Sequence, residues 1–133
     1  MEQLIFAENH IQVYYNPQEE WLYVKWLGLQ TNTSVMAGFE KVLEYLKAHQ
    51  CTKVLNNSLL MDGIWSAAAR WVANNWFPRL HAAGPIWFVW IYAPDGLSQL
   101  SITKTLSLMA PENIKFIKIF HELPSAQQWL RTI

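Results

Sequence analysis

The stretch IWFVWIYA, Ile86–Ala93, is apolar at almost every position and decides the fold class. Continuous apolar runs of this length are typical of a strand at the centre of a sheet whose two faces are both covered. Pro85 and Pro94 bound the run. It is far shorter than the roughly 20 apolar residues that a membrane-spanning helix needs, so we expect no insertion into a membrane.

Upstream of this run, the pattern predicts a β-hairpin. HIQVYY, residues 10–15, alternates apolar and polar side chains with the two-residue period of a strand. NPQEE supplies a turn, and EWLYVKWLG, residues 20–28, is a second strand rich in aromatic and β-branched residues. MEQLIF, residues 1–6, is expected to add a short edge strand.

After the hairpin, helical and extended segments alternate. Helical spacing of apolar residues runs from Thr33 to His49. The later segments are a short strand at 52–57, a loop at 58–63, a helix at 64–77, the apolar strand, a helix at 97–109 capped by Asp95, a strand at 114–120 and a helix from Pro124. Because each of these strands is followed by a helix, we expect parallel pairing. The predicted fold is α/β, with a mixed, mainly parallel sheet of four to six strands and about four packed helices.

Length and charge narrow the function classes. The chain has 133 residues, 52% of them hydrophobic, which fits one globular domain over residues 1–133. Ten basic and ten acidic residues cancel, so we expect no binding to nucleic acid. The single cysteine, Cys51, and a start without the features of a signal peptide favour a cytoplasmic location.

The segment GIWSAAARWVANNWFPRL, Gly63–Leu80, holds three of the eight tryptophans. On a helix, Trp65 and Trp76 would lie within about 20° of each other, which predicts that both belong to the core. Trp71 would lie about 120° from that stripe, either under a neighbouring loop or on a pocket or partner surface. Pro78 is expected to end or kink the helix near residues 76–77.

Four segments together resemble a known family. YYNPQEEWLYVKWLG, KVLNN, GIWSAAARWVANNWFPRL and FVWIYAP, in this order, are similar to the SpoIIAA-like branch of the STAS superfamily, over about residues 10–133. The resemblance implies a STAS-type sheet with helices packed against it. It implies less about activity, because a fold does not fix a function.

In the anti-sigma-factor antagonists of that superfamily, a serine of an Asp-Ser-Ser-Gly run is phosphorylated. The matching region here, NSLLMDGIWSAA, has Asp62 and Gly63 with no serine between them. Ser58 and Ser66 lie nearby and are the candidate phosphorylation sites. A phosphate at a helix N-terminus would be favoured by free amides and by the helix dipole.

A polar cluster is expected at the carboxyl end of the strand at 52–57, which is the usual ligand-binding edge of an open α/β sheet. Its members are Asn56, Asn57, Ser58 and Asp62. With tryptophans of the next segment beside it, the cluster would form an aromatic pocket. Alternatively, Asn57 and Asp62 cap backbone amides in a loop.

Residues that carry chemistry are sparse. The histidines at positions 10, 49, 81 and 121 fall in different elements and do not show metal-ligand spacing. Cys51 has only Lys53 as a nearby cation to activate it. We therefore expect no catalytic site, no metal and no cofactor.

Three functions remain open. The leading hypothesis is a non-catalytic regulatory module that binds a protein partner or forms a homodimer, with aromatic residues at the interface. The first alternative is a domain for a small hydrophobic or lipid ligand, with a pocket walled by Trp65, Trp71 and Trp76. The second alternative is a phosphorylation-controlled switch.

Overall fold

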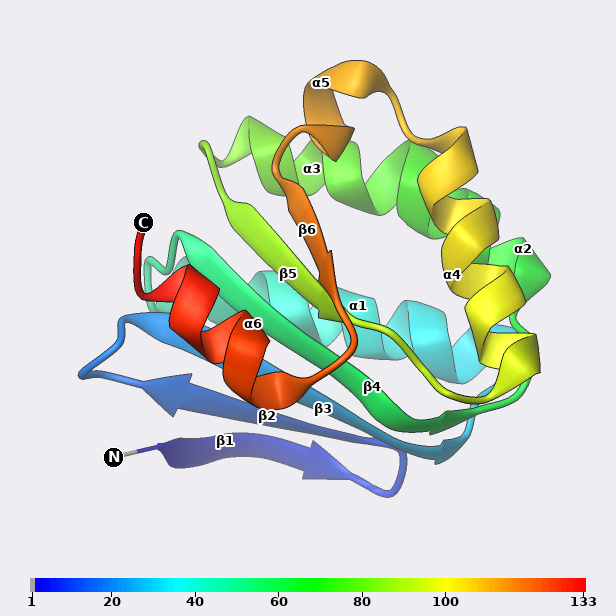
Figure 1. Ribbon diagram of the computed structural model, residues 1–133, viewed down its shortest axis with the longest axis horizontal. Coiled ribbons are helices and arrows are strands. Elements are labelled where there is room, and N and C mark those ends of the chain that lie inside the picture. The colour runs from blue at the N-terminus through cyan, green and yellow to red at the C-terminus, as the bar shows by residue number, and fades with distance from the viewer. Residues whose placement is uncertain (1) are drawn as a thin grey trace.

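The computed structural model describes residues 2–133 and contains a six-stranded mixed sheet with the strand order β1-β2-β3-β4-β5-β6 (Figure 1). The first three strands pair antiparallel, and β3, β4, β5 and β6 pair parallel. The strands are β1 Gln3–Glu8, β2 Ile11–Asn16, β3 Trp21–Leu29, β4 Lys53–Asp62, β5 Trp87–Ile91 and β6 Ile117–Phe120. The α/β class and the mixed sheet are thus confirmed. The apolar run forms β5, which is paired on both sides, but it is the fifth of six strands and adjoins the edge strand β6 rather than lying at the centre of the sheet.

The helical segments are α1 Asn32–Ala48, α2 Ser66–Trp71, η1 Val72–Trp76, α3 Phe77–Ala82, α4 Gly96–Leu108, α5 Pro111–Ile114 and α6 Leu123–Leu130. Because α2, η1 and α3 run on without a break, residues 2–133 contain five continuous helices where about four were expected. As predicted, Asp95 caps α4, its side chain accepting from the Ser98 amide.

Helices cover the two faces of the sheet unequally. Figure 1 shows α1 behind the sheet and the short α6 in front of it. The main core joins side chains of α1, the 66–82 helix and α4 to one face. A smaller cluster places Ala126 and Leu130 of α6 against Leu55 and Val89 on the other face. Each parallel crossover moves one strand along the sheet, so right-handed connections put the intervening helices on the same side.

The expected loop at 58–63 is wrong, because β4 continues to Asp62. Its second half pairs with the end of β3, where Leu60 lies beside Leu27 and Asp62 beside Leu29. An irregularity between Lys25 and Leu27 puts an extra residue into β4. The strand is extended by pairing with β3, which is distant in the sequence, so the residues at 58–62 do not themselves indicate a strand.

Of the two outcomes expected near residues 76–77, an end of the helix is wrong, because the helix runs through Pro78 to Ala82. The segment before the proline is a π turn, in which the Phe77 amide donates to the Val72 carbonyl, five residues back. Proline lacks an amide hydrogen and clashes with the turn before it in a regular helix. The wider turn accommodates that defect without ending the helix.

Candidate functional site

Two of the expected site residues point into the main core. Asn56 Oδ1 accepts a hydrogen bond from Trp26 Nε1 at 2.8 Å, and Ser58 Oγ accepts one from Trp90 Nε1 at 3.2 Å. All four side chains are buried. A buried indole N–H needs an acceptor, so both polar residues of β4 have a structural role in the core.

Asn57 lies on the opposite face of β4. Its Nδ2 donates to the Tyr23 hydroxyl at 2.7 Å, and its Oδ1 accepts from the Leu59 amide at 2.9 Å. Burial raises the pKa of Tyr23 above its ordinary 10.0, and the hydrogen bond from Asn57 partly offsets that effect. Asn57 therefore satisfies a backbone amide, which is what the capping alternative predicted. It does so within strand β4 and not in a loop.

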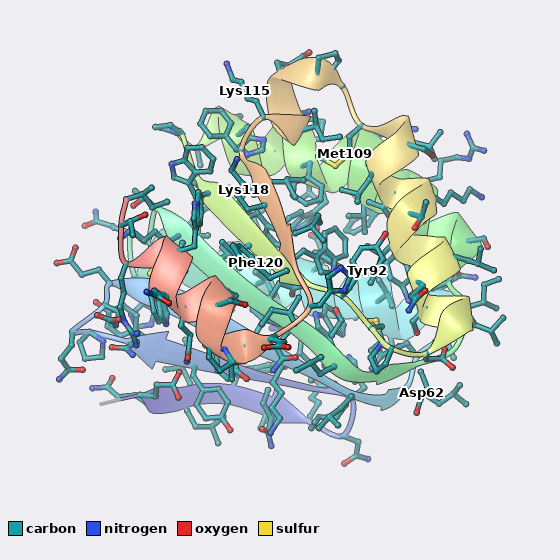
Figure 2. All side chains as sticks on the ribbon, in the orientation of Figure 1. Asp62, Tyr92, Met109, Lys115, Lys118 and Phe120 are labelled. Atoms are coloured by element: carbon teal, nitrogen blue, oxygen red, sulfur yellow. The ribbon has the colours of Figure 1, made fainter. Side chains whose placement is uncertain are left out.

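Asp62 is exposed at the end of β4, and Figure 2 shows it at the margin of the molecule. The expected capping role belongs to another carboxylate. Asp95 Oδ2 accepts from the Gly63 amide at 3.2 Å and from the Ser98 amide at 3.1 Å. Asp95 thus fastens the end of β4 to the first turn of α4.

Trp65 and Trp76 are fully buried, which confirms their expected place in the core. Trp76 Nε1 donates to the Phe39 carbonyl at 2.7 Å, and the Trp76 ring packs edge-on against Phe39 and Phe88. Trp65 Nε1 is buried without a hydrogen-bond partner among residues 2–133. Aromatic rings of the protein itself fill the space around Trp76.

Trp71 is half-buried and has a cation over its ring. The Arg79 guanidinium carbon lies 5.6 Å from the Trp71 ring centre. Arg79 Nε also donates to Asn75 Oδ1 at 2.8 Å, and the guanidinium forms an ion pair with Glu40 of α1. Arg79 therefore ties the π turn to α1 and covers part of the Trp71 ring.

The candidate phosphorylation sites differ in access. The Ser58 side chain is fully buried, so a kinase could reach its hydroxyl only after local unfolding. Ser66 is half-buried and is the first residue of α2. Of the two, only Ser66 has the position at a helix N-terminus that would favour a phosphate.

An exposed apolar surface lies where β3, β4 and α4 meet, and sequence reasoning missed it. We call it the apolar rim. Its side chains are between 50% and 74% exposed and belong to Leu29, Leu60, Ile64, Leu97 and Leu100.

Gly63 links two parts of the apolar rim, Leu29 of β3 and the first turn of α4. A Cβ atom added at Gly63 would lie 2.9 Å from Cδ1 of Leu29, so Leu29 lies directly against that glycine. Ser98 Oγ donates to the Gly63 carbonyl at 2.8 Å, which brings the first turn of α4, with Leu97, to the same place. Leucines three residues apart on α4, at 97 and 100, were the only local signal of this surface.

The titratable side chains show little arrangement for catalysis. Residues 2–133 contain no group of three or more His, Cys, Asp or Glu side chains that could hold a metal ion. Burial, with a smaller contribution from Glu20, raises the pKa of the Cys51 thiol from 9.0 to about 11. The thiol therefore stays protonated at neutral pH, whereas nucleophilic cysteines are thiolates.

No family model matches the chain, and no curated protein matches it. Across residues 2–133, none of the helices is long and apolar enough to cross a membrane.

Proposed function

We propose that this protein is a non-catalytic interaction module of the STAS type that binds a protein partner, or a second copy of itself, through the apolar rim. The rim is the single observation that carries the proposal. Five large aliphatic side chains at one end of the sheet are at least half exposed, whereas elsewhere in residues 2–133 only Leu4, at 54%, is exposed to that extent. Several large apolar side chains left exposed in neighbouring segments are typical of protein–protein contact sites.

The surroundings of the rim support a specific interface. Asp62 is exposed beside Leu29 in the β3–β4 pairing, so a carboxylate borders the apolar surface. An apolar centre with a polar margin is the usual anatomy of an interface. The backbone beneath the rim is held by the Asp95 and Ser98 hydrogen bonds to Gly63, so the surface is ordered before any partner binds.

The pocket alternative has less support. Trp76 has its ring packed between Phe39 and Phe77, with ring centres 4.7 and 4.9 Å away, so protein atoms occupy the space that a ligand would need. The STAS assignment rests on the sequence resemblance together with an α/β mixed sheet. The phosphorylation alternative now depends on Ser66 alone.

A comparison of tagged variants tests the proposal. Wild-type protein and the double variant Leu29→Lys/Leu97→Lys are purified from cells of the source organism, and co-purifying proteins are quantified by mass spectrometry. Leu4→Lys is the matched control, because Leu4 is 54% exposed and lies in β1, outside the rim. We expect a partner, or the untagged chain, with the wild type and the control but not with the double variant. Equal recovery with all three would contradict the proposal.

A further inference from the structure

A second surface lies at one edge of the sheet. β6 is the last strand in the sheet order, so it pairs with β5 on one side and with no further strand of residues 2–133 on the other (Figure 1). We call the unpaired side of Ile117–Phe120 the β6 edge. β6 contributes no residue to the apolar rim, and the interaction proposal leaves this edge without a role.

The backbone of β6 turns alternate residues outward. The carbonyl groups of Phe116 and Phe120 accept hydrogen bonds from amides on the β5 side, at 3.0 and 2.9 Å. The direction of these backbone groups alternates from one residue to the next along a strand. Ile117 and Ile119 therefore turn their amide and carbonyl groups away from β5. Unpaired groups of this kind are a template for a further strand.

The β6 edge is regular, whereas the opposite edge of the sheet is not. At that edge, the register of β1 shifts between Leu4 and Phe6, and a bulge of this kind hinders pairing with another chain. The β5–β6 register has no such shift. A lysine on an edge strand can also keep other chains away. The Lys118 ammonium instead lies over the Trp129 ring of α6, 5.6 Å from its centre, on one face of the sheet.

The side chains at the β6 edge indicate the chemistry of a partner. Lys115 and Lys118 are exposed, and neither forms an ion pair with a residue that the structure describes. The acidic residues nearest in the sequence, Glu112 and Glu122, lie outside the strand, in α5 and just before α6. Ile119 points to the other face of the sheet and is 38% exposed. An added strand would thus place one set of side chains beside a lysine and the other set beside an apolar group.

A second copy of β6 does not suit this edge. An antiparallel pairing that joins Ile117 of each copy to Ile119 of the other would put Lys118 directly opposite Lys118. Like charges in directly opposed positions of a sheet are destabilising. The charge of the β6 edge therefore favours an acidic partner strand.

We propose that the β6 edge binds an extended segment of another protein in which acidic and apolar residues alternate. The segment adds a seventh strand, whose backbone pairs with the outward groups of Ile117 and Ile119. Its acidic side chains lie beside Lys118, and its apolar side chains cover Ile119. In this mode of recognition, backbone hydrogen bonds supply affinity and alternate side chains supply specificity.

Nuclear magnetic resonance of the ¹⁵N-labelled full chain tests this inference. The probe is a hexapeptide of alternating valine and glutamate, acetylated and amidated at its ends and titrated at constant ionic strength. We expect saturable shifts of the Ile117 and Ile119 amides. A hexapeptide of alternating valine and lysine should give no saturable shift. Shifts that are absent, equal for the two peptides or confined to the apolar rim would overturn the proposal.

Two further measurements separate strand pairing from the alternatives. The valine–glutamate peptide methylated on every backbone nitrogen keeps its charge but cannot donate hydrogen bonds to β6, so we expect its binding to be lost. Equal binding of the methylated peptide would overturn the proposal. So would shifts of the β6 amides with protein concentration in the absence of peptide, because they would show that a second copy occupies the edge.

Two variants locate the binding. Lys118→Glu should weaken binding of the valine–glutamate peptide by about fivefold or more, because it replaces attraction by repulsion. Lys47→Glu makes the same change of charge at an exposed position in α1 and should leave affinity unchanged. Because both side chains are exposed, the spectra of the free variants will report whether they fold. Equal affinity of Lys118→Glu and wild type would overturn the proposal.

Discussion

Trp90 donates its indole hydrogen to the hydroxyl of Ser58, at 3.2 Å, in the middle of the main core. Two residues earlier on β4, Asn56 accepts the same kind of bond from the indole of Trp26. Asn56 and Ser58 of β4 therefore supply hydrogen-bond acceptors to tryptophans on the two neighbouring strands. Large aromatic rings supply buried apolar area, and these acceptors remove the cost of burying their N–H groups.

Ser58→Ala tests that relationship. The change removes one oxygen and leaves Trp90 Nε1 without an acceptor, so we expect a loss of about 1–2 kcal/mol in the free energy of unfolding. Ser66→Ala is the control, because its hydroxyl forms no hydrogen bond with the described residues, and it should change stability by less than about 0.5 kcal/mol. Urea unfolding followed by tryptophan fluorescence measures both. Equal stability of the two variants would show that the Trp90 bond is unimportant.

Gly38→Ala tests the close approach of α1 to the sheet. A Cβ atom at Gly38 would lie 2.4 Å from Cη2 of Trp26, whose ring is fully buried and cannot move freely. We expect a loss of about 2–3 kcal/mol by urea unfolding. Gly96→Ala adds the same methyl group where no atom lies within 4 Å, and it should be neutral or slightly stabilising. An unchanged free energy of unfolding for Gly38→Ala would show that α1 does not approach the Trp26 ring this closely.

Gln50→Gly tests the backbone strain just after the end of α1. Gln50 follows the end of α1 with a φ of 53°, a conformation that glycine adopts without steric cost. We expect the variant to gain about 0.5–1 kcal/mol in the free energy of unfolding, measured by thermal or urea unfolding. A destabilised variant would show that contacts of the Gln50 side chain outweigh the backbone strain.

Cys51 predicts a pH dependence. Its pKa is about 11 in the folded chain against an ordinary value of 9.0, so the protonated thiol is favoured by folding. This contribution is fully present below pH 9 and is lost as the pH rises toward 11. We expect the stability difference between wild type and Cys51→Ala to fall by on the order of 2 kcal/mol over that range. A difference that stays constant with pH would contradict the raised pKa.

Sequence reasoning succeeded where the signal is local. The alternation in residues 10–15, the helical spacing in 33–49 and the apolar run of β5 each predict their own element. It failed where distant segments decide the outcome. The second half of β4 exists because β3 pairs with it. The continuation of the helix through Pro78 was missed for a different, local reason, which is the π turn just before the proline.

The candidate site shows the same division. Burial of Trp65 and Trp76 followed from their spacing, and the structure confirms it. The bonds from Trp26 to Asn56 and from Trp90 to Ser58 cross between strands, so no pattern within β4 could indicate them. The apolar rim combines residues from three separate segments of the chain, so no single segment could indicate it.

Site-specific photo-crosslinking in cells of the source organism shows directly whether the apolar rim contacts a partner. A photoreactive amino acid replaces Leu97 in the apolar rim, and in a control chain it replaces Ala48, which is exposed at the far end of α1. If the rim is the contact surface, irradiation will yield one defined crosslinked species at position 97, to a partner or to a second copy, and none at position 48. Crosslinking that is absent at position 97, or equal at both positions, would contradict the account.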